Sequence, residues 1–139
     1  FQVLLSPRKA YLTSLAVTAR EQRARQLHQQ GYNCCQSVVM AFADLLPVPA
    51  EQALAMAAPF GRGLSGCREL CGALSGAIMA VGMKYGAENR AQVNAADKEI
   101  VTAFREQFGA VRCADLKAAK ISCDDVIAFA AEKAEELLK

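Results

Sequence analysis

The chain has 139 residues, a length typical of a single domain, and its 53% apolar and 22% charged residues exclude a disordered or low-complexity protein. A net charge of +2 is too small to indicate a nucleic-acid surface, and no run approaches the roughly 18 consecutive apolar residues of a membrane helix. The unusual feature is a set of six cysteines beside one histidine and no tryptophan. We expect these cysteines to serve chemistry or to bind a metal, since a core of this size needs no cross-links.

The first predicted helix covers residues 7–30. Apolar residues recur there at a spacing of about 3.6 residues, Pro7 suits a helix start, and Gly31 suits a stop. Residues 8–19 also resemble a short secretory signal. Their polar side chains and the continuing helical spacing argue against one, so we expect a cytoplasmic protein. Residues 1–6 are expected to be irregular or vector-derived.

Proline and glycine separate the next three elements. Asn33 is a good N-cap for a helix over residues 34–46, and two prolines then introduce a third helix over residues 50–58. Residues 59–66 contain three glycines and are predicted to form a loop.

A helix over residues 69–85 is predicted to lie at the centre of the molecule. It is almost uncharged between its ends, as expected of a helix that is buried on all sides. Gly72, Gly76 and Ala80 recur at steps of four, a spacing of small residues that lets another helix approach closely.

The C-terminal part is predicted to add two more helices. They cover residues 89–108 and 122–139, and an irregular segment over residues 110–121 joins them. No segment alternates between apolar and polar residues like a β-strand. The expected fold is therefore one all-α domain over residues 1–139, a compact bundle of about six helices.

Several cysteines fall where predicted helices begin. Cys34 follows the N-cap Asn33, Cys123 follows the N-cap Ser122, and Cys71 lies near the start of the central helix. The free amide protons and positive dipole end at a helix start favour a thiolate, which is both the nucleophilic and the metal-binding form of cysteine. Helix-start reasoning therefore selects Cys34 and Cys123 directly and allows Cys71.

The remaining features near these positions are weaker signals. Cys35 is expected to act as a small buried hydrophobe, because its neighbour holds the capped position. Cys67 would share a helix face with Cys71 only if the central helix began early. Asp124 and Asp125 suit a helix N-terminus, but they would oppose a negative charge on the preceding cysteine, and we expect only partial cancellation.

Two alternative kinds of chemistry find little support. Cysteine–histidine catalysis would need His28, which we expect to be a solvated surface residue of the first helix. Residues 61–66 resemble a dinucleotide-binding loop in their glycines, but no strand precedes them.

Several parts of the sequence together resemble a known family. They are YNCCQSV at residues 32–38, PFGRG at 59–63, CGALSGA at 71–77, GMKYG at 82–86, and the later cysteines Cys113 and Cys123. In order and spacing, this set resembles the C_GCAxxG_C_C family of redox-active proteins, which is named for its cysteine pattern and its CGAxxG motif. The resemblance covers most of the chain.

The resemblance implies which residues form the site. The four family cysteines would be Cys34, Cys71, Cys113 and Cys123, and the supporting candidates are Asn33, Cys67, Gly72, Ala73 and Gly76. Cys113 comes from the resemblance alone, since helix-start reasoning does not select it. The family usually has alanine at the position of Cys35, and Cys67 is additional to its pattern. The resemblance also implies redox activity and genes that lie beside transporter genes in bacteria and archaea.

Three functions stay open at this point. The first is thiol–disulfide exchange or electron transfer, as in a thiol–disulfide oxidoreductase without a cofactor, with the cysteine pairing undetermined. The second is a zinc ion or iron–sulfur cluster held by Cys34, Cys71, Cys113 and Cys123. The third is a structural helical interaction module. The expected partner is an unidentified redox protein, with a transporter-associated protein and a homodimer left open, and neither nucleic acid nor membrane insertion is expected.

Overall fold

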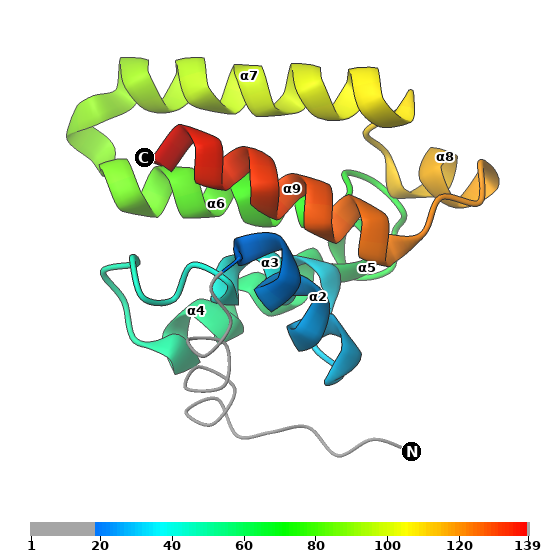
Figure 1. The fold of residues 1–139 in the computed structure, drawn as a ribbon, viewed down its shortest axis with the longest axis horizontal. Helices are drawn as coiled ribbons and strands as arrows, with labels where there is room; N and C mark the ends of the chain where they lie inside the picture. The colour runs from blue at the N-terminus through cyan, green and yellow to red at the C-terminus, as the bar shows by residue number, and fades with distance from the viewer. Residues whose placement is uncertain (1–18, 139) are drawn as a thin grey trace.

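The computed structural model describes residues 19–138 and confirms an all-α fold (Figure 1). Its elements are α2 (Arg20–Gln29), α3 (Cys34–Met40), α4 (Ala50–Ala57), the 3-10 helix η1 (Ala58–Phe60), α5 (Gly61–Leu64), α6 (Gly72–Tyr85), the 3-10 helix η2 (Ala87–Asn89), α7 (Arg90–Phe108), α8 (Cys113–Ala118) and α9 (Cys123–Leu138). None of the helices in this part of the chain is long and apolar enough to cross a membrane. The expectations for residues 1–6, for a signal over residues 8–19 and for the first turns of the helix over residues 7–30 lie outside the described residues.

Helix α6 lies at the centre of the bundle, as its small, uncharged residues predict. It packs against α3, α7 and α9, and Figure 1 shows it between the long upper helix α7 and the N-terminal helices. Its residues Ala73, Leu74 and Ala77 are completely buried. A helix with such small side chains can be surrounded by other helices on several sides. Its N-terminal end therefore lies close to several other segments of the chain.

The close approach of α3 to α6 depends on Gly76. A Cβ atom at this position would lie 2.9 Å from the backbone oxygen of Cys35 and 2.9 Å from the Cβ of Val38. Any side chain here would push the two helices apart, because one of the obstructing atoms belongs to the backbone. The predicted role of Gly76 in close packing is therefore confirmed.

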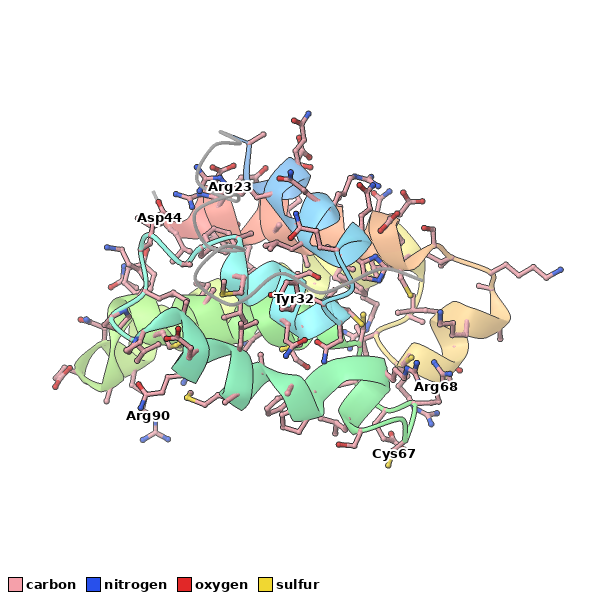
Figure 2. The ribbon with its side chains drawn as sticks, turned by 90° about the horizontal axis from the view of Figure 1, so that it is seen from below. Arg23, Tyr32, Asp44, Cys67, Arg68 and Arg90 are labelled. Carbon is pink, nitrogen blue, oxygen red and sulfur yellow. The ribbon has the colours of Figure 1, made fainter. Side chains whose placement is uncertain are left out.

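Helix α2 is joined to the turn after α3 by an ion-pair cluster around Asp44. Both carboxylate oxygens of Asp44 accept hydrogen bonds from Arg20, and Arg23 contacts the same carboxylate at 3.3 Å (Figure 2). The hydrogen bond from Arg20 is the main cause that lowers the pKa of Asp44 below its ordinary value.

The prediction that one helix covers residues 34–46 is wrong at its C-terminal end. Helix α3 ends at Met40, and the chain then turns with short-range bonds such as that from the amide of Leu45 to the oxygen of Phe42.

Two further boundaries differ from the sequence expectation. The central helix begins at Gly72 rather than at residue 69, and the segment predicted as irregular over residues 110–121 contains α8. Both differences have one cause, since Leu70 and Arg112 form an isolated antiparallel β-bridge. This long-range backbone pairing extends the chain before α6 and fixes the start of α8.

Candidate functional site

The four family cysteines meet at one small cavity. Cys34, Cys71, Cys113 and Cys123 all line a space of about 20 Å³ between α3, α6, α8 and α9. This is enough for about one water molecule, and the side chains of Leu116, Ile121 and Val126 also contribute to the lining. All four are free thiols, as are Cys35 and Cys67.

Cys71 and Cys113 are brought together by backbone hydrogen bonds. The amide of Cys71 donates to the oxygen of Val111 at 2.9 Å, and the amide of Cys113 donates to the oxygen of Glu69 at 2.6 Å. Cys71 is the N-cap residue of α6, and Cys113 is the first residue of α8. The antiparallel bridge therefore places two helix starts beside each other, although 41 residues separate the two cysteines along the chain (113 − 71 − 1).

Cys34 is positioned by the cap of its own helix. The side chain of Asn33 accepts a hydrogen bond from the amide of Gln36 at 2.9 Å, and the side chain of Gln36 accepts one from the amide of Asn33 at 3.1 Å. This complete capping box fixes Cys34 as the first residue of α3, as predicted. Asn33 also donates to the oxygen of Ala58 at 3.0 Å, which ties this helix start to η1.

Gly72 allows Cys34 to approach the start of α6. A Cβ atom on Gly72 would lie 3.2 Å from the sulfur of Cys34 and 2.8 Å from the backbone oxygen of Phe60. Gly72, a supporting candidate from the sequence, therefore lets both a sulfur and a backbone segment come close to the start of α6. The CGAxxG motif thus supplies a cysteine at the helix start and the space for a second cysteine next to it.

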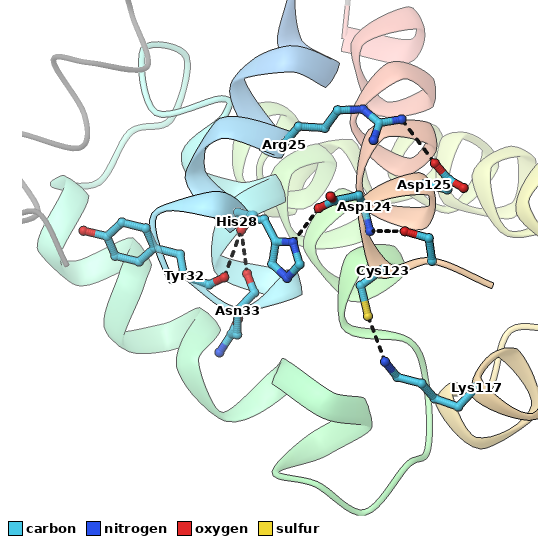
Figure 3. A network of polar contacts seen from close by, with 10 residues as sticks. Arg25, His28, Tyr32, Asn33, Lys117, Cys123, Asp124 and Asp125 are labelled. Atoms are coloured by element: carbon cyan, nitrogen blue, oxygen red, sulfur yellow. Dashed lines mark hydrogen bonds and ion pairs between the residues drawn. The ribbon is translucent and has the colours of Figure 1, made fainter. Parts of the chain in front are cut away.

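Two cations contact the sulfurs. The ammonium group of Lys117 lies 3.1 Å from the sulfur of Cys123 (Figure 3), and the guanidinium group of Arg68 lies 3.5 Å from the sulfur of Cys113. The contact with Cys123 raises the pKa of Lys117, and the contact with Cys113 raises the pKa of Arg68. Both cations remain charged near neutral pH and stabilise negative charge on the sulfurs that they contact.

The two aspartates after Cys123 are paired with basic residues of α2. Asp124 contacts the Nδ1 atom of His28 at 2.6 Å, and Asp125 accepts a hydrogen bond from Arg25 at 3.3 Å (Figure 3). These partners reduce the repulsion that the two carboxylates would exert on a Cys123 thiolate. His28, which the sequence predicts to be a solvated surface residue, is partly exposed, and its ring faces Asp124.

Two cysteines are disfavoured as thiolates by burial. Burial raises the pKa of Cys71 to about 11, although the amides of Leu74 and Ala73 act in the opposite direction. Burial also raises the pKa of Cys35 to about 12. Cys35 is completely buried, and its sulfur lies 3.6 Å from the sulfur of Met79, as expected of a small core residue.

A larger and more open cleft adjoins the four cysteines. It has a volume of about 510 Å³, and Cys34, Cys113 and Cys123 line it. Cys71 does not line this cleft and borders only the small cavity. Three cysteines are therefore accessible from the cleft, and the fourth lies behind them.

The arginines of this cleft come from a strained segment. Arg62, Leu64, Ser65 and Arg68 all have positive φ angles, which cost about 1–2 kcal/mol for each non-glycine residue. The segment is held by hydrogen bonds from the amide of Arg68 to the oxygen of Arg62 and from the amide and hydroxyl of Ser65 to the oxygen of Pro59. The prediction of a simple loop over residues 59–66 is therefore incomplete, since the segment contains η1 and a left-handed turn within α5.

Gly63 brings this segment against Cys113. Its φ angle is +67°, and a Cβ atom there would lie 2.7 Å from the Cβ of Cys113 and 2.6 Å from the amide nitrogen of Glu69. A glycine is required here because the φ angle is positive and because there is no space for a Cβ atom.

The remaining predicted residues are placed as follows. Cys67 is exposed at the edge of the molecule (Figure 2), lines neither cavity and is not part of the cluster. Because α6 begins at Gly72, Cys67 and Cys71 do not share a helix face. Ala73 is fully buried beside the site and contributes its backbone amide rather than its side chain.

Sequence reasoning missed the cations Arg62, Arg68 and Lys117. Lys117 is four residues after Cys113, so a prediction of α8 would have placed both on one helix face. No local signal predicts the left-handed turn that carries Arg62.

The described residues contain no group of three or more histidine, cysteine, aspartate or glutamate side chains arranged to hold a metal ion. Two of the four clustered sulfurs face cations instead. As placed, the four cysteine side chains are not arranged as a ligand set for zinc or an iron–sulfur cluster.

Comparison with known proteins agrees with the cysteine pattern. Residues 32–137 match the family described as "Putative redox-active protein (C_GCAxxG_C_C)". Neither the curated proteins nor the solved structures give a match. Because the matched residues include all four clustered cysteines and most of the chain, this protein belongs to the C_GCAxxG_C_C family.

Proposed function

We propose that this protein carries out thiol–disulfide exchange with the cysteine cluster defined by Cys34, Cys71, Cys113 and Cys123. The observation that carries the proposal is that four cysteines from separate helix starts line one cavity, while cations contact two of their sulfurs. Thiols that serve only to fill a core have no need of cationic partners.

Cys123 is the best candidate for the attacking sulfur. It lines the open cleft, it is the first residue of α9, and Lys117 contacts its sulfur. Cys71 is a poor first nucleophile, because it is buried and its pKa is raised to about 11. Exchange depends on the thiolate fraction and the access of the attacking thiol, and both disfavour Cys71.

The reaction then follows ordinary exchange chemistry. The Cys123 thiolate attacks one sulfur of a disulfide substrate, which forms a mixed disulfide and releases the other half as a thiolate. A second cysteine of the cluster, ionised by loss of its proton to solvent, attacks the Cys123 sulfur. An intrachain disulfide forms and the second substrate thiolate leaves, so the protein loses two electrons and the substrate gains two.

Equilibration of the protein in buffers of graded reduced-to-oxidised glutathione ratio tests this proposal. The free thiols are blocked by alkylation and counted by mass spectrometry. We expect a loss of two thiols at one defined midpoint, and Cys67→Ser should leave that midpoint unchanged. A protein that keeps all six thiols over the whole range would contradict the proposal.

Metal content separates this function from the ligand-set alternative. Zinc, iron and acid-labile sulfide are measured on protein that is purified without oxygen. We expect less than stoichiometric metal. One metal ion or cluster per chain, lost when Cys34 or Cys123 is replaced by serine, would overturn the exchange proposal in favour of a metal site.

A further inference from the structure

The open cleft beside the cysteine cluster has the properties of a binding site for a small molecule. Its volume of about 510 Å³ lies within the usual range for ligand sites, roughly 300–1,000 Å³. Three cysteines line it, so a molecule bound there would lie against the sulfurs that we propose to react.

The charged side chains that line the cleft are cationic. Arg62, Arg68 and Lys117 contribute to its lining, and no aspartate or glutamate does. Among residues 19–138, none of these three cations forms an ion pair with a carboxylate. Arg68 and Lys117 have sulfur partners, whereas Arg62 has no sulfur in contact. Cations that are gathered in a concave site without acidic partners attract anionic ligands.

Two of these cations lie on a segment with a strained backbone. Arg62 and Arg68 both have positive φ angles, and a hydrogen bond of 3.2 Å joins the amide of Arg68 to the oxygen of Arg62. The two arginines therefore lie on a segment whose backbone conformation is held by hydrogen bonds. Their guanidinium groups are well suited to bind carboxylates, since they donate hydrogen bonds in a planar fork.

We infer that the substrate of this site is a small disulfide that carries carboxylate groups, with Arg62 as a specificity-determining residue. The inference rests on the proposed thiol–disulfide exchange. A carboxylate on each half of the substrate would bind to the cations of the cleft while its sulfur–sulfur bond faces Cys123.

The anionic partner of Lys117 changes as exchange proceeds. When the Cys123 thiolate attacks, its negative charge passes to the leaving sulfur of the substrate, and Lys117 loses its anionic partner on the protein. Lys117 is then free to bind a carboxylate of the attached half. A carboxylate on the attached half would thus replace the Cys123 thiolate as the anionic partner of Lys117.

The test measures how fast the reduced protein is oxidised by three small disulfides. The probes are dithiodipropionate, which is anionic, hydroxyethyl disulfide, which is neutral, and cystamine, which is cationic. Each rate is divided by the rate of the same disulfide with dithiothreitol, which removes intrinsic differences between the probes. At low salt we expect the order anionic, neutral, cationic, with about fivefold between successive probes, and a smaller spread at high salt.

A pair of substitutions tests the role of Arg62. Arg62→Gln should reduce the rate with dithiodipropionate about fivefold and leave the rate with hydroxyethyl disulfide unchanged, while Arg62→Lys should keep most of the preference. Lys133→Gln, on the far part of α9, serves as the charge-matched control and should change neither rate.

The outcomes separate this inference from the proposed function. Equal normalised rates for the three probes would overturn the substrate class, and a preference that Arg62→Gln does not reduce would overturn the role of Arg62; both outcomes leave exchange intact. Failure of every disulfide to oxidise the protein would overturn both.

Discussion

The helical core and the cysteine cluster are built in different ways. In the core, α6 is surrounded by α3, α7 and α9 through apolar packing of buried side chains such as Leu74, Ile100 and Phe104. Around the cluster, short helices, left-handed residues and one β-bridge hold the chain through backbone hydrogen bonds. The comparison indicates that the residues that stabilise the fold and the residues that tune the thiols are largely separate, with Cys71 belonging to both sets. The following predictions test that separation.

The largest effect is expected for Gly76→Ala in the core. Its Cβ atom would meet the backbone oxygen of Cys35 at 2.9 Å, so α3 and α6 must separate. We expect a loss of about 2–3 kcal/mol in the free energy of unfolding, measured by urea denaturation. The matched control is Gly82→Ala in the same helix, where a Cβ atom meets nothing within 4 Å. It should be neutral or stabilise by up to about 1 kcal/mol, and an equal loss in both variants would refute the packing argument.

Gly63→Ala should disturb the cluster more than the core. The new Cβ atom would collide with Cys113 and with the amide of Glu69, at a residue whose φ angle is +67°. We expect a loss of stability of about 1–2 kcal/mol and a clear change in the alkylation rate of Cys113. Gly66→Ala is the control, since its φ angle is also positive but the space around it is open. If the Cys113 rate changes equally in both variants, the specific contact is unimportant.

Lys117→Gln should alter the chemistry with little effect on the fold. The ammonium group contacts the sulfur of Cys123 from an exposed position, so its removal should slow alkylation of Cys123 at neutral pH by about fivefold. The melting temperature should change little. Lys117→Arg should retain most of the alkylation rate of Cys123. If Cys123 is alkylated at the same rate in Lys117→Gln and Lys117→Arg, the contact does not activate the thiol.

The smallest effect is expected at Asp97 on α7. Burial raises the pKa of this carboxyl to about 6, and one of its oxygens is buried without a hydrogen-bond partner. The folded state therefore loses stability as the pH rises from about 4 to about 6, because the unfolded chain ionises at the lower pH. Asp97→Asn should stabilise the protein at pH 7 by about 0.5–1 kcal/mol, after allowance for partial exposure, and should have no effect near pH 3. Equal effects at both pH values would contradict this explanation.

The core follows closely from the sequence because its signals are local. The small residues of α6 predict a central helix, and glycine steps of four predict the close approach that Gly76 makes. The starts of α3 and α9 were also predictable, since Asn33 and Ser122 are strong N-cap residues and each is followed by a cysteine. Helix propensity and capping act over a few residues and can be recognised in one sequence.

The rest of the site depends on long-range contacts that have no local signal. The N-cap residue of α8 is Arg112, whose side chain makes no capping hydrogen bond. The start of α8 is fixed instead by backbone hydrogen bonds to the segment before α6. Positive φ angles at Arg62, Leu64 and Ser65 likewise occur at residues that do not favour them. The position of Cys113 could be expected only from the family resemblance. Lys117 could be expected only from a prediction of α8, and Arg62 and Arg68 from no local signal.

The central claim is that four remote cysteines form one reactive cluster, and disulfide mapping after mild oxidation tests it most directly. The reduced protein is treated with one equivalent of diamide, its remaining thiols are blocked, and the digested protein is analysed by mass spectrometry. We predict one dominant intrachain disulfide in which both cysteines are among Cys34, Cys71, Cys113 and Cys123. A dominant bond that involves Cys67, or the absence of any intrachain bond, would contradict the account.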